Sequence, residues 1–363
     1  QLTNEASSAW VDAKEQNEYA LFRPYLSKVL AYRKRFAGYK DATRPVYDVL
    51  LDEHEKGMSM ETLDRFFAML RERLVPLIGA VKDQPIDTSF LRRPCPIIRQ
   101  RELSDELMRI MGIDRAHCAI AETEHPFTEG GHALYDLGIA DEYAYTCLAD
   151  GASMGIHESQ SRLYENMIGH SAPFLRFLYP RLREFFPDAF AGVNGRMFYC
   201  AANAVCPSLI RTEADEVTYP LHVMVRYELE KQLVSGSLTV EDLPAAWNAL
   251  YKEYLGLDVP SDTMGVLQDM HWSDGSFGYF PTYALGSAYA AQFMAAMRKE
   301  LDTDVLMEKG DLAPITAWLQ SHVHRYGKLK NPADLMIKAC GEAFDPQYYV
   351  DHLSTKVREI ENA

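Results

Sequence analysis

Residues 19–36 read YALFRPYLSKVLAYRKRF, and this stretch decides the class of fold. Its apolar residues recur at spacings of three and four, which puts them on one face of a helix. The same pattern predicts further helices over residues 61–75, 159–168, 171–186, 208–233, 241–254, 285–301, 312–326 and 347–360. We therefore expect a mostly α-helical protein.

Residues 265–286 interrupt this helical pattern. They are rich in glycine and aromatic residues, a composition that disfavours a helix. Residues 276–280, SFGYF, suit a short strand or a tight loop. We expect a small β or loop element that lines a pocket, and the alternative is a loop that only packs aromatic rings.

Composition restricts the class of function and the compartment. The formal net charge of −15 is spread along the 363 residues, which argues against nucleic acid and anionic membranes as partners. No apolar run is long enough to span a bilayer, and the six cysteines form no Cys-x-x-Cys pair. These features predict a cytoplasmic protein. Neither repeats nor low-complexity linkers mark a boundary, so we expect residues 1–363 to form a single domain.

Glu129 and His132 lie one helical turn apart, so they share one helix face. There one could bind a metal ion while the other handles a proton of water. The Glu-x-x-His pattern alone is weak, because it often arises by chance. Between them, Gly130 and Gly131 cost a helix about 1 kcal/mol each relative to alanine. Close approach of another backbone, or of substrate, would explain why the glycines are tolerated.

His157 and Glu158 follow on a second predicted helix and could complete a metal site. Adjacent residues on a helix point about 100° apart, so both side chains cannot easily face one ion. We take Glu158 as the ligand and His157 as a neighbouring or substrate-facing group. Arg162 lies four residues after Glu158, a spacing typical of an intrahelical salt bridge.

Two further segments carry polar groups suited to substrate binding. Arg211 and Asp215 are four residues apart, which predicts an intrahelical pair unless Arg211 stays available to bind a carboxylate. Gln268, Asp269 and His271 come together at the start of the glycine- and aromatic-rich segment. Three polar groups at such a place favour a functional site.

The segments HESQSR (157–162), IRTEAD (210–215) and GVLQDMHW (265–272) together resemble the M32, or carboxypeptidase Taq, family of metallocarboxypeptidases. The resemblance extends over nearly the whole chain and includes His-Pro-Phe-Thr at 125–128 and His-Ala-Leu-Tyr at 132–135. It implies a large helical metallopeptidase fold with a central groove, usually a homodimer, and one divalent ion, zinc or cobalt. Such enzymes release single C-terminal residues from peptides with broad specificity.

The resemblance also implies roles for individual residues. His132 and Glu158 would be metal ligands, and Glu129 would be the general base acting on metal-activated water. Arg211 and His271 would hold the substrate's C-terminal carboxylate and the reacting carbonyl, with Tyr283 nearby. We add Gln268, Asp269 and His157 to the substrate-binding set.

The chain departs from the family pattern where Thr128 meets Glu129. The family motif is His-Glu-x-x-His, yet Thr128 stands at the position of the first histidine. Family members also carry a longer connection at this point, and a further helical region before the first residue here. Either the connection was deleted, or the sequence joins residues across a segment that it omits. We favour the second interpretation.

Two alternatives to a metallocarboxypeptidase remain open. The first is a peptide-binding pseudo-peptidase that has lost the first metal histidine. The second treats Glu122-x-x-His125 and Glu129-x-x-His132 as the paired motifs of a di-iron helix bundle. Such motifs must come from two separate helices, whereas only three residues part these two, and one of them is Pro126.

Overall fold

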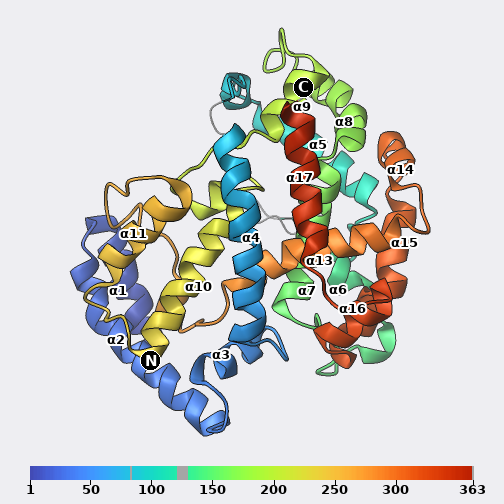
Figure 1. Cartoon of the computed structure of the whole chain (residues 1–363). Coiled ribbons are helices and arrows are strands. Elements are labelled where there is room, and N and C mark those ends of the chain that lie inside the picture. The colour runs from blue at the N-terminus through green and yellow to red at the C-terminus, as the bar shows by residue number, and fades with distance from the viewer. Residues whose placement is uncertain (82–83, 121–129, 362–363) are drawn as a thin grey trace. The chain divides into compact units, whose positions relative to one another are not determined.

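The described part of the chain is helical (Figure 1). A computed structural model describes residues 1–81, 84–120 and 130–361, and no β-strand occurs among them. The mostly α-helical class is therefore confirmed. None of the helices in these ranges combines the length and the apolarity needed to cross a membrane.

The chain divides into two compact units, each built from two segments. The first unit comprises residues 1–82 and 205–284, and the second comprises residues 83–204 and 285–363. The expectations of a single domain and of a central groove stay predictions.

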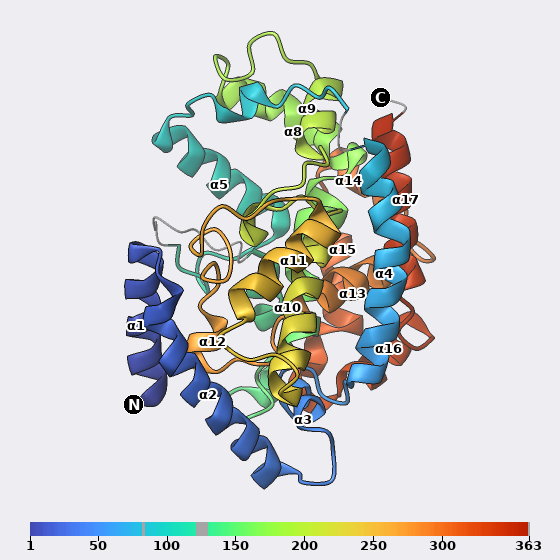
Figure 2. The ribbon, with the colours of Figure 1, turned by 60° about the vertical axis from the view of Figure 1, so that its left-hand side comes forward.

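In the first unit, α10 is the central helix. Thirteen of its 17 residues are buried, and it contacts α2, α3, α4 and α11. Helices α1 and α2 run side by side in both views (Figures 1 and 2). The elements of this unit are α1 (Leu2–Gln16), α2 (Tyr19–Lys40), α3 (Val46–His54), α4 (Met60–Val81), η4 (Arg211–Glu213), α10 (Tyr219–Ser235), α11 (Leu243–Leu255) and α12 (His271–Asp274).

In the second unit, α6 and α7 pack together and carry the histidines of interest. Helix α13 (Pro281–Met297) begins in the first unit and continues in the second. The other elements of the second unit are η1 (Ser89–Arg92), α5 (Ile97–Met111), α6 (Gly130–Gly138), η2 (Asp141–Tyr143), α7 (Met154–Arg162), the π-helix η3 (Leu163–Gly169), α8 (Ala172–Phe185), α9 (Gly195–Ala202), α14 (Thr303–Lys309), α15 (Ala313–His322), η5 (His324–Leu329), α16 (Pro332–Cys340) and α17 (Gln347–Glu361).

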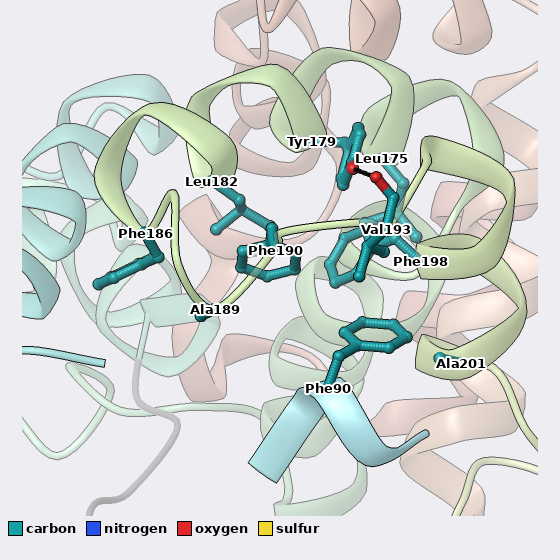
Figure 3. Packing of buried hydrophobic residues seen from close by; sticks show 10 residues of the cluster. All are labelled: Phe90, Leu175, Tyr179, Leu182, Phe186, Ala189, Phe190, Val193, Phe198 and Ala201. Atoms are coloured by element: carbon teal, nitrogen blue, oxygen red, sulfur yellow. Dashed lines mark hydrogen bonds between the residues drawn. The ribbon is translucent and has the colours of Figure 1, made fainter. Parts of the chain in front are cut away.

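An aromatic cluster joins η1, α8 and α9 within the second unit (Figure 3). The Tyr179 ring stacks on Phe198 with ring centroids 5.6 Å apart, and Phe190 meets Phe198 edge-on. The Tyr179 hydroxyl donates to the Val193 carbonyl, so its polar end is satisfied inside the cluster. Aromatic burial of this kind fixes α8 against the loop that follows it.

Most of the predicted helices form close to their expected bounds, but two are partly wrong. The helix predicted over 312–326 breaks at Val323, where α15 has ended and the 3-10 segment η5 follows. The helix predicted over 208–233 begins at Tyr219, because residues 208–218 form a loop with the single turn η4. Asp215 stabilises this loop, since its carboxylate accepts the backbone N–H groups of Cys206, Val217 and Thr218. A side chain that binds nearby backbone in this way competes with helix formation.

Of the two forms expected for residues 276–280, the tight loop is correct and the strand is wrong. Gly278 has a φ of +88°, a conformation that other residues rarely adopt. A Cβ atom on Gly278 would lie 2.9 Å from the backbone of Leu50 in α3. The loop therefore depends on glycine for both its conformation and its packing.

Candidate functional site

A glycine at the start of α6 lets this helix approach α7 closely. A Cβ atom on Gly131 would lie 2.3 Å from the carbonyl oxygen of Gln160. The expectation that another backbone approaches the glycine pair is therefore confirmed for Gly131, whereas a Cβ atom on Gly130 would meet the Met111 side chain, 2.8 Å from its Cε atom. The contact at Gly131 brings His132 of α6 next to His157 and Glu158 of α7.

His132 contacts both of these residues through different ring nitrogens. Its Nε2 lies 3.4 Å from Glu158 Oε2, and its Nδ1 lies 2.7 Å from His157 Nδ1. His157 Nε2 in turn lies 3.2 Å from Asp136 Oδ1. The two α7 side chains thus meet opposite sides of the His132 ring, in agreement with the expected divergence of adjacent helix residues.

Glu158 is held as a carboxylate by a cation of its own helix. Arg162 Nε donates to Glu158 Oε1 over 2.8 Å, as the four-residue spacing predicts, and Arg162 Nη1 donates to Glu165. Burial alone would raise the pKa of the Glu158 carboxyl, but Arg162 and His132 hold that pKa below its ordinary value. Glu158 Oε2 is therefore a negatively charged atom that faces His132 Nε2.

This pair of atoms suits a divalent ion. Two ligands bound at about 2.0–2.2 Å to one tetrahedral ion lie about 3.4 Å apart, and imidazole nitrogen with carboxylate oxygen is a common zinc ligand set. The described residues contain no group of three His, Cys, Asp or Glu side chains that could hold an ion. Thr128, at the family's first ligand position, and the predicted base Glu129 both lie outside the described residues.

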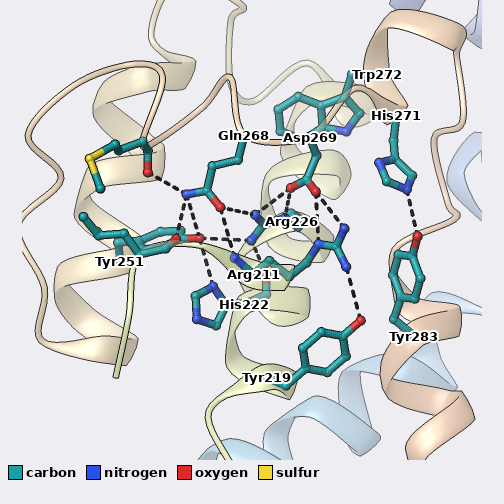
Figure 4. Close-up of polar contacts among 12 residues, drawn as sticks. Arg211, Tyr219, His222, Arg226, Tyr251, Gln268, Asp269, His271, Trp272 and Tyr283 are labelled. Atoms are coloured by element: carbon teal, nitrogen blue, oxygen red, sulfur yellow. Dashed lines mark hydrogen bonds and ion pairs between the residues drawn. The ribbon is translucent and has the colours of Figure 1, made fainter. Parts of the chain in front are cut away.

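In the first unit, Asp269 joins two buried arginines (Figure 4). Arg211 donates to Asp269 Oδ1 through Nε and Nη2, over 3.1 and 2.8 Å. Arg226 Nε donates to Asp269 Oδ2 over 2.7 Å. Burial alone would raise the pKa of Asp269, but the two guanidinium groups hold it far below its ordinary value. The cluster keeps an excess of one positive charge.

Gln268 orders the backbone around this cluster. Its Oε1 accepts from Arg226 Nη2 and from the backbone N–H of Arg211, over 3.1 and 3.3 Å. Its Nε2 donates to the carbonyl oxygens of Leu209 and Met264. Gln268 therefore ties the loop before η4 to the segment that carries Asp269.

His271 and Tyr283 form a neighbouring pair in the first unit. His271 Nε2 lies 3.0 Å from the Tyr283 hydroxyl, and the Arg211 guanidinium lies 4.6 Å from the centre of the Tyr283 ring. Burial lowers the pKa of His271 to about 4, so the ring is neutral at pH 7. His271 Nδ1 is buried and has no hydrogen-bond partner among the described residues. Within this pair, His271 Nδ1 is therefore the buried polar atom for which the described residues provide no hydrogen-bond partner.

The intrahelical pair of Arg211 and Asp215 is wrong. Arg211 lies in η4 and pairs with Asp269, whereas the Asp215 carboxylate accepts the Thr218 hydroxyl and nearby backbone N–H groups. Residues four apart contact each other in an α-helix, but this segment is not an α-helix, so their spacing does not bring Arg211 and Asp215 together.

Sequence analysis missed Arg226 and Asp136. Arg226 is fully buried, and its signal was a cation that directly follows the apolar run 223–225 within a predicted helix. Asp136 follows His132 by four residues, so it projects from the same side of α6. That spacing could have suggested a carboxylate partner for the histidine pair.

Comparisons with known proteins agree with these motifs. The carboxypeptidase Taq (M32) metallopeptidase family model matches residues 1–130 and 127–357. The chain belongs to this family. It is therefore a metallocarboxypeptidase by descent, as the resemblance of its three motifs implied.

Individual relatives match over almost the whole chain. Carboxypeptidase 1 of Bacillus subtilis is 41% identical over 391 aligned positions, which cover 99% of this chain and 78% of the relative. Thermostable carboxypeptidase 1 of Thermus thermophilus is 37% identical and covers 98% and 78%. The crystal structure of an M32 carboxypeptidase from Deinococcus radiodurans R1 is 35% identical, with a TM-score of 0.96, and covers 100% and 79%.

The comparisons also bear on the Thr128-Glu129 junction. The family model matches in two parts that meet at residues 127–130. The alignments with the two relatives are 391 and 396 positions long, longer than the 363 residues of this chain. The relatives therefore carry residues that have no counterpart here.

Proposed function

We propose that the chain is a metal-dependent carboxypeptidase that releases single C-terminal residues from peptides with broad specificity. The observation that carries this proposal is the separation of 3.4 Å between His132 Nε2 and Glu158 Oε2, in a chain of the M32 family. In this proposal His132 and Glu158 hold one divalent ion, zinc or cobalt. Such an ion polarises a peptide carbonyl and makes water a stronger nucleophile.

Glu129 is the proposed general base. It lies three residues before His132, so a helical extension of α6 would direct both side chains to one face. Arg162 keeps the Glu158 carboxylate charged through its ion pair with Oε1. The other carboxylate oxygen, Oε2, stays directed toward His132.

Arg211 is the proposed anchor of the substrate's terminal carboxylate. The pairing of Arg211 and Arg226 with a single Asp269 leaves one positive charge in excess, which favours an anion. Gln268 and Asp269 then act by holding Arg211 in place.

His271 and Tyr283 are proposed to contact the reacting carbonyl region, since His271 Nδ1 is a buried polar atom with no partner in the described chain. His157 is proposed to contact the metal ligand His132 without binding the ion itself.

The alternative is a peptide-binding pseudo-peptidase. Thr128 is the observation that favours it, because a threonine replaces the first histidine of His-Glu-x-x-His. A cytoplasmic location and a homodimer also belong to the proposal, as family expectations.

The test compares two blocked dipeptides that differ at one group, a free C-terminal carboxylate or its amide. Purified wild type and Thr128→His are assayed with added zinc or cobalt, and Glu158→Gln is the control for metal-dependent turnover. The proposal expects metal-dependent cleavage of the free acid alone, abolished in Glu158→Gln. Peptide binding without turnover in the wild type, with turnover restored in Thr128→His, would favour the pseudo-peptidase. Neither binding nor turnover in either protein would contradict both.

A further inference from the structure

Arg226 belongs to the buried polar cluster of the first unit, but it cannot reach a ligand itself (Figure 4). Its side chain is 0% exposed. All three guanidinium nitrogens donate to the protein: Nε to Asp269 Oδ2, Nη1 to the His222 carbonyl and the Tyr251 hydroxyl, and Nη2 to Gln268 Oε1. A buried cation whose donors all face protein acceptors can act on a substrate only through its neighbours.

Arg211, the proposed anchor, differs from Arg226 because it keeps donors available. Its Nη1 makes one hydrogen bond, to the Tyr219 hydroxyl over 3.2 Å, and its Nη2 makes one, to Asp269 Oδ1 over 2.8 Å. Each of these nitrogens carries two N–H groups, so one N–H on each has no acceptor among the described residues. Two such groups on one guanidinium match the two oxygens of a carboxylate. Arg211 can therefore bind a carboxylate that Arg226 cannot touch.

Arg226 contacts Arg211 indirectly by two routes. In the first, Arg226 Nε and Nη2 lie 2.7 and 2.6 Å from Asp269 Oδ2, which leaves Oδ1 to accept from the Arg211 guanidinium. In the second, Gln268 Oε1 accepts both from Arg226 Nη2 over 3.1 Å and from the Arg211 backbone N–H over 3.3 Å. A guanidinium only donates, so Arg226 requires the oxygen of the Gln268 amide to lie on this side. Arg226 thus fixes both the side chain and the backbone of Arg211.

Arg226 is itself held in place by its surroundings. Its guanidinium lies 4.5 Å from the centre of the ring of Trp247, a buried residue, and Nη1 binds the carbonyl of His222 one turn earlier in α10. We propose that Arg226 is a positioning residue that acts through Asp269 and Gln268 to hold Arg211 in the orientation that binds a C-terminal carboxylate. Selectivity for a free acid over an amide then depends on a residue that never touches the peptide. This inference rests on the anchor role proposed for Arg211.

The test measures dissociation constants of the same two blocked dipeptides, the free acid and the amide. Isothermal titration is carried out with a chelator present, so that neither peptide is cleaved. We expect the wild type to prefer the free acid and Arg211→Met to lose that preference. Arg226→Met should weaken binding of the free acid by about tenfold, a size typical of coupled residues in one polar network, and leave binding of the amide unchanged.

Arg65→Met is the matched control, because it loses the same charge from the same unit. Arg65 lies in α4, and its side chain is 73% exposed. We expect this variant to bind both peptides as the wild type does. Equal affinity for the free acid in Arg226→Met and Arg65→Met would overturn the inference.

Two further variants separate positioning from charge. Arg226→Lys keeps the positive charge, but one ammonium group cannot replace three nitrogens in a fixed plane. We expect it to bind the free acid almost as weakly as Arg226→Met does, and wild-type affinity would overturn the positioning role. Because Arg226→Lys keeps a buried cation opposite Asp269, it carries the test if Arg226→Met does not fold.

The second of these variants combines Arg211→Met with Arg226→Met. Since Arg226 acts through Arg211, we expect the double variant to bind the free acid no more weakly than Arg211→Met alone. Additive losses would show that Arg226 acts independently of Arg211, and they would also overturn the inference.

The pattern of results separates this inference from the proposed function. An acid preference that is lost in Arg211→Met but kept in both Arg226 variants would retain the anchor role and reject the positioning role. A wild type that binds acid and amide equally, with no change in Arg211→Met, would reject the anchor role and the positioning role with it, whatever the protein does with metal.

Discussion

Asp269 is a single carboxylate between two guanidinium groups that lie almost out of reach of solvent. The Arg211 and Arg226 side chains are 7% and 0% exposed. Removing one partner of a buried charge cluster typically costs about 3–5 kcal/mol, because the remaining charges stay buried without compensation. We therefore expect Asp269→Asn to lower the free energy of unfolding by about that amount, as measured in urea. The control is Asp258→Asn, whose side chain is 87% exposed, and which should stay within about 0.5 kcal/mol of wild type. Equal effects of the two substitutions would contradict this account.

Glu230 gives a pH dependence that can be measured. It is fully buried in α10, accepts from Tyr47, Trp272 and the Gly278 N–H, and burial raises its pKa to about 7. The unfolded chain ionises near pH 4.5, so between pH 4.5 and 7 the folded state binds more protons than the unfolded state. The Glu230 contribution is thus complete below pH 4.5 and is lost as pH rises to 7, by on the order of 3 kcal/mol.

The measurement compares urea unfolding of wild type and Glu230→Gln across that pH range. We expect the stability difference between them to shift against the wild type as pH rises. Gln232→Ala, on the same helix, removes no titratable group and should keep a constant offset. A constant offset for Glu230→Gln as well would show that folding does not raise the pKa of Glu230.

From the sequence, it was easier to predict which residues belong to the candidate site than to predict which residues contact each other. The motifs singled out Arg211, Asp269 and Glu158, whose roles stay predictions. Arg162 could be paired with Glu158 because both lie on one helix. Arg211 could not be paired correctly, since its partner is 58 residues away and local spacing suggested Asp215 instead. Contacts between distant segments depend on tertiary packing, which periodicity does not encode.

Helices with a continuous apolar face were predictable, because burial of that face dominates their stability. The pattern over 19–36 gave α2, which buries Phe22, Leu26 and Val29 on one side. The pattern over 208–233 failed in its first half, where Asp215 binds backbone N–H groups and Gln268 accepts the Arg211 N–H. Local polar contacts there outweigh an apolar pattern that would otherwise continue the helix.

The approach of α6 to α7 depends on one missing side chain. A methyl group on Gly131 would lie 2.3 Å from Gln160 O and 2.7 Å from Ser161 Cα, both backbone atoms that cannot turn aside. We expect Gly131→Ala to destabilise the protein by about 1–3 kcal/mol and to weaken zinc binding, because His132 and Glu158 separate as the helices move apart. The measurements are urea unfolding and zinc competition.

Gly38→Ala is the matched control, since Gly38 lies in α2 and a Cβ atom there meets nothing within 4 Å. It should be neutral or stabilise the protein by up to about 1 kcal/mol. If Gly131→Ala behaved like Gly38→Ala in both measurements, the close contact would not set the helix spacing.

At the scale of the whole molecule, the junction of Thr128 and Glu129 decides between an active enzyme and a binding protein. Two parts of the family model meet at this place, and the aligned relatives are longer than the chain. The described residues supply His132, Glu158 and the arginine cluster, each with the surroundings that its proposed role needs. It is unexpected for a protein to keep these surroundings in detail while losing the ligand and the connection at a single point. This favours an omitted segment over a deletion.

Peptide mapping of the purified protein tests that interpretation. Trypsin cuts after Arg115 and Arg162, and no lysine or arginine lies between them, so a true Thr128-Glu129 bond gives one peptide covering residues 116–162. We expect this peptide to be absent, and Thr128 and Glu129 to be found in peptides extended by further residues, with a histidine directly before Glu129. The intact mass should then exceed 41.2 kDa. Detection of the uninterrupted 116–162 peptide would instead establish the deletion, and the restored activity expected of Thr128→His would then decide whether the remaining site is a pseudo-peptidase that lacks one ligand.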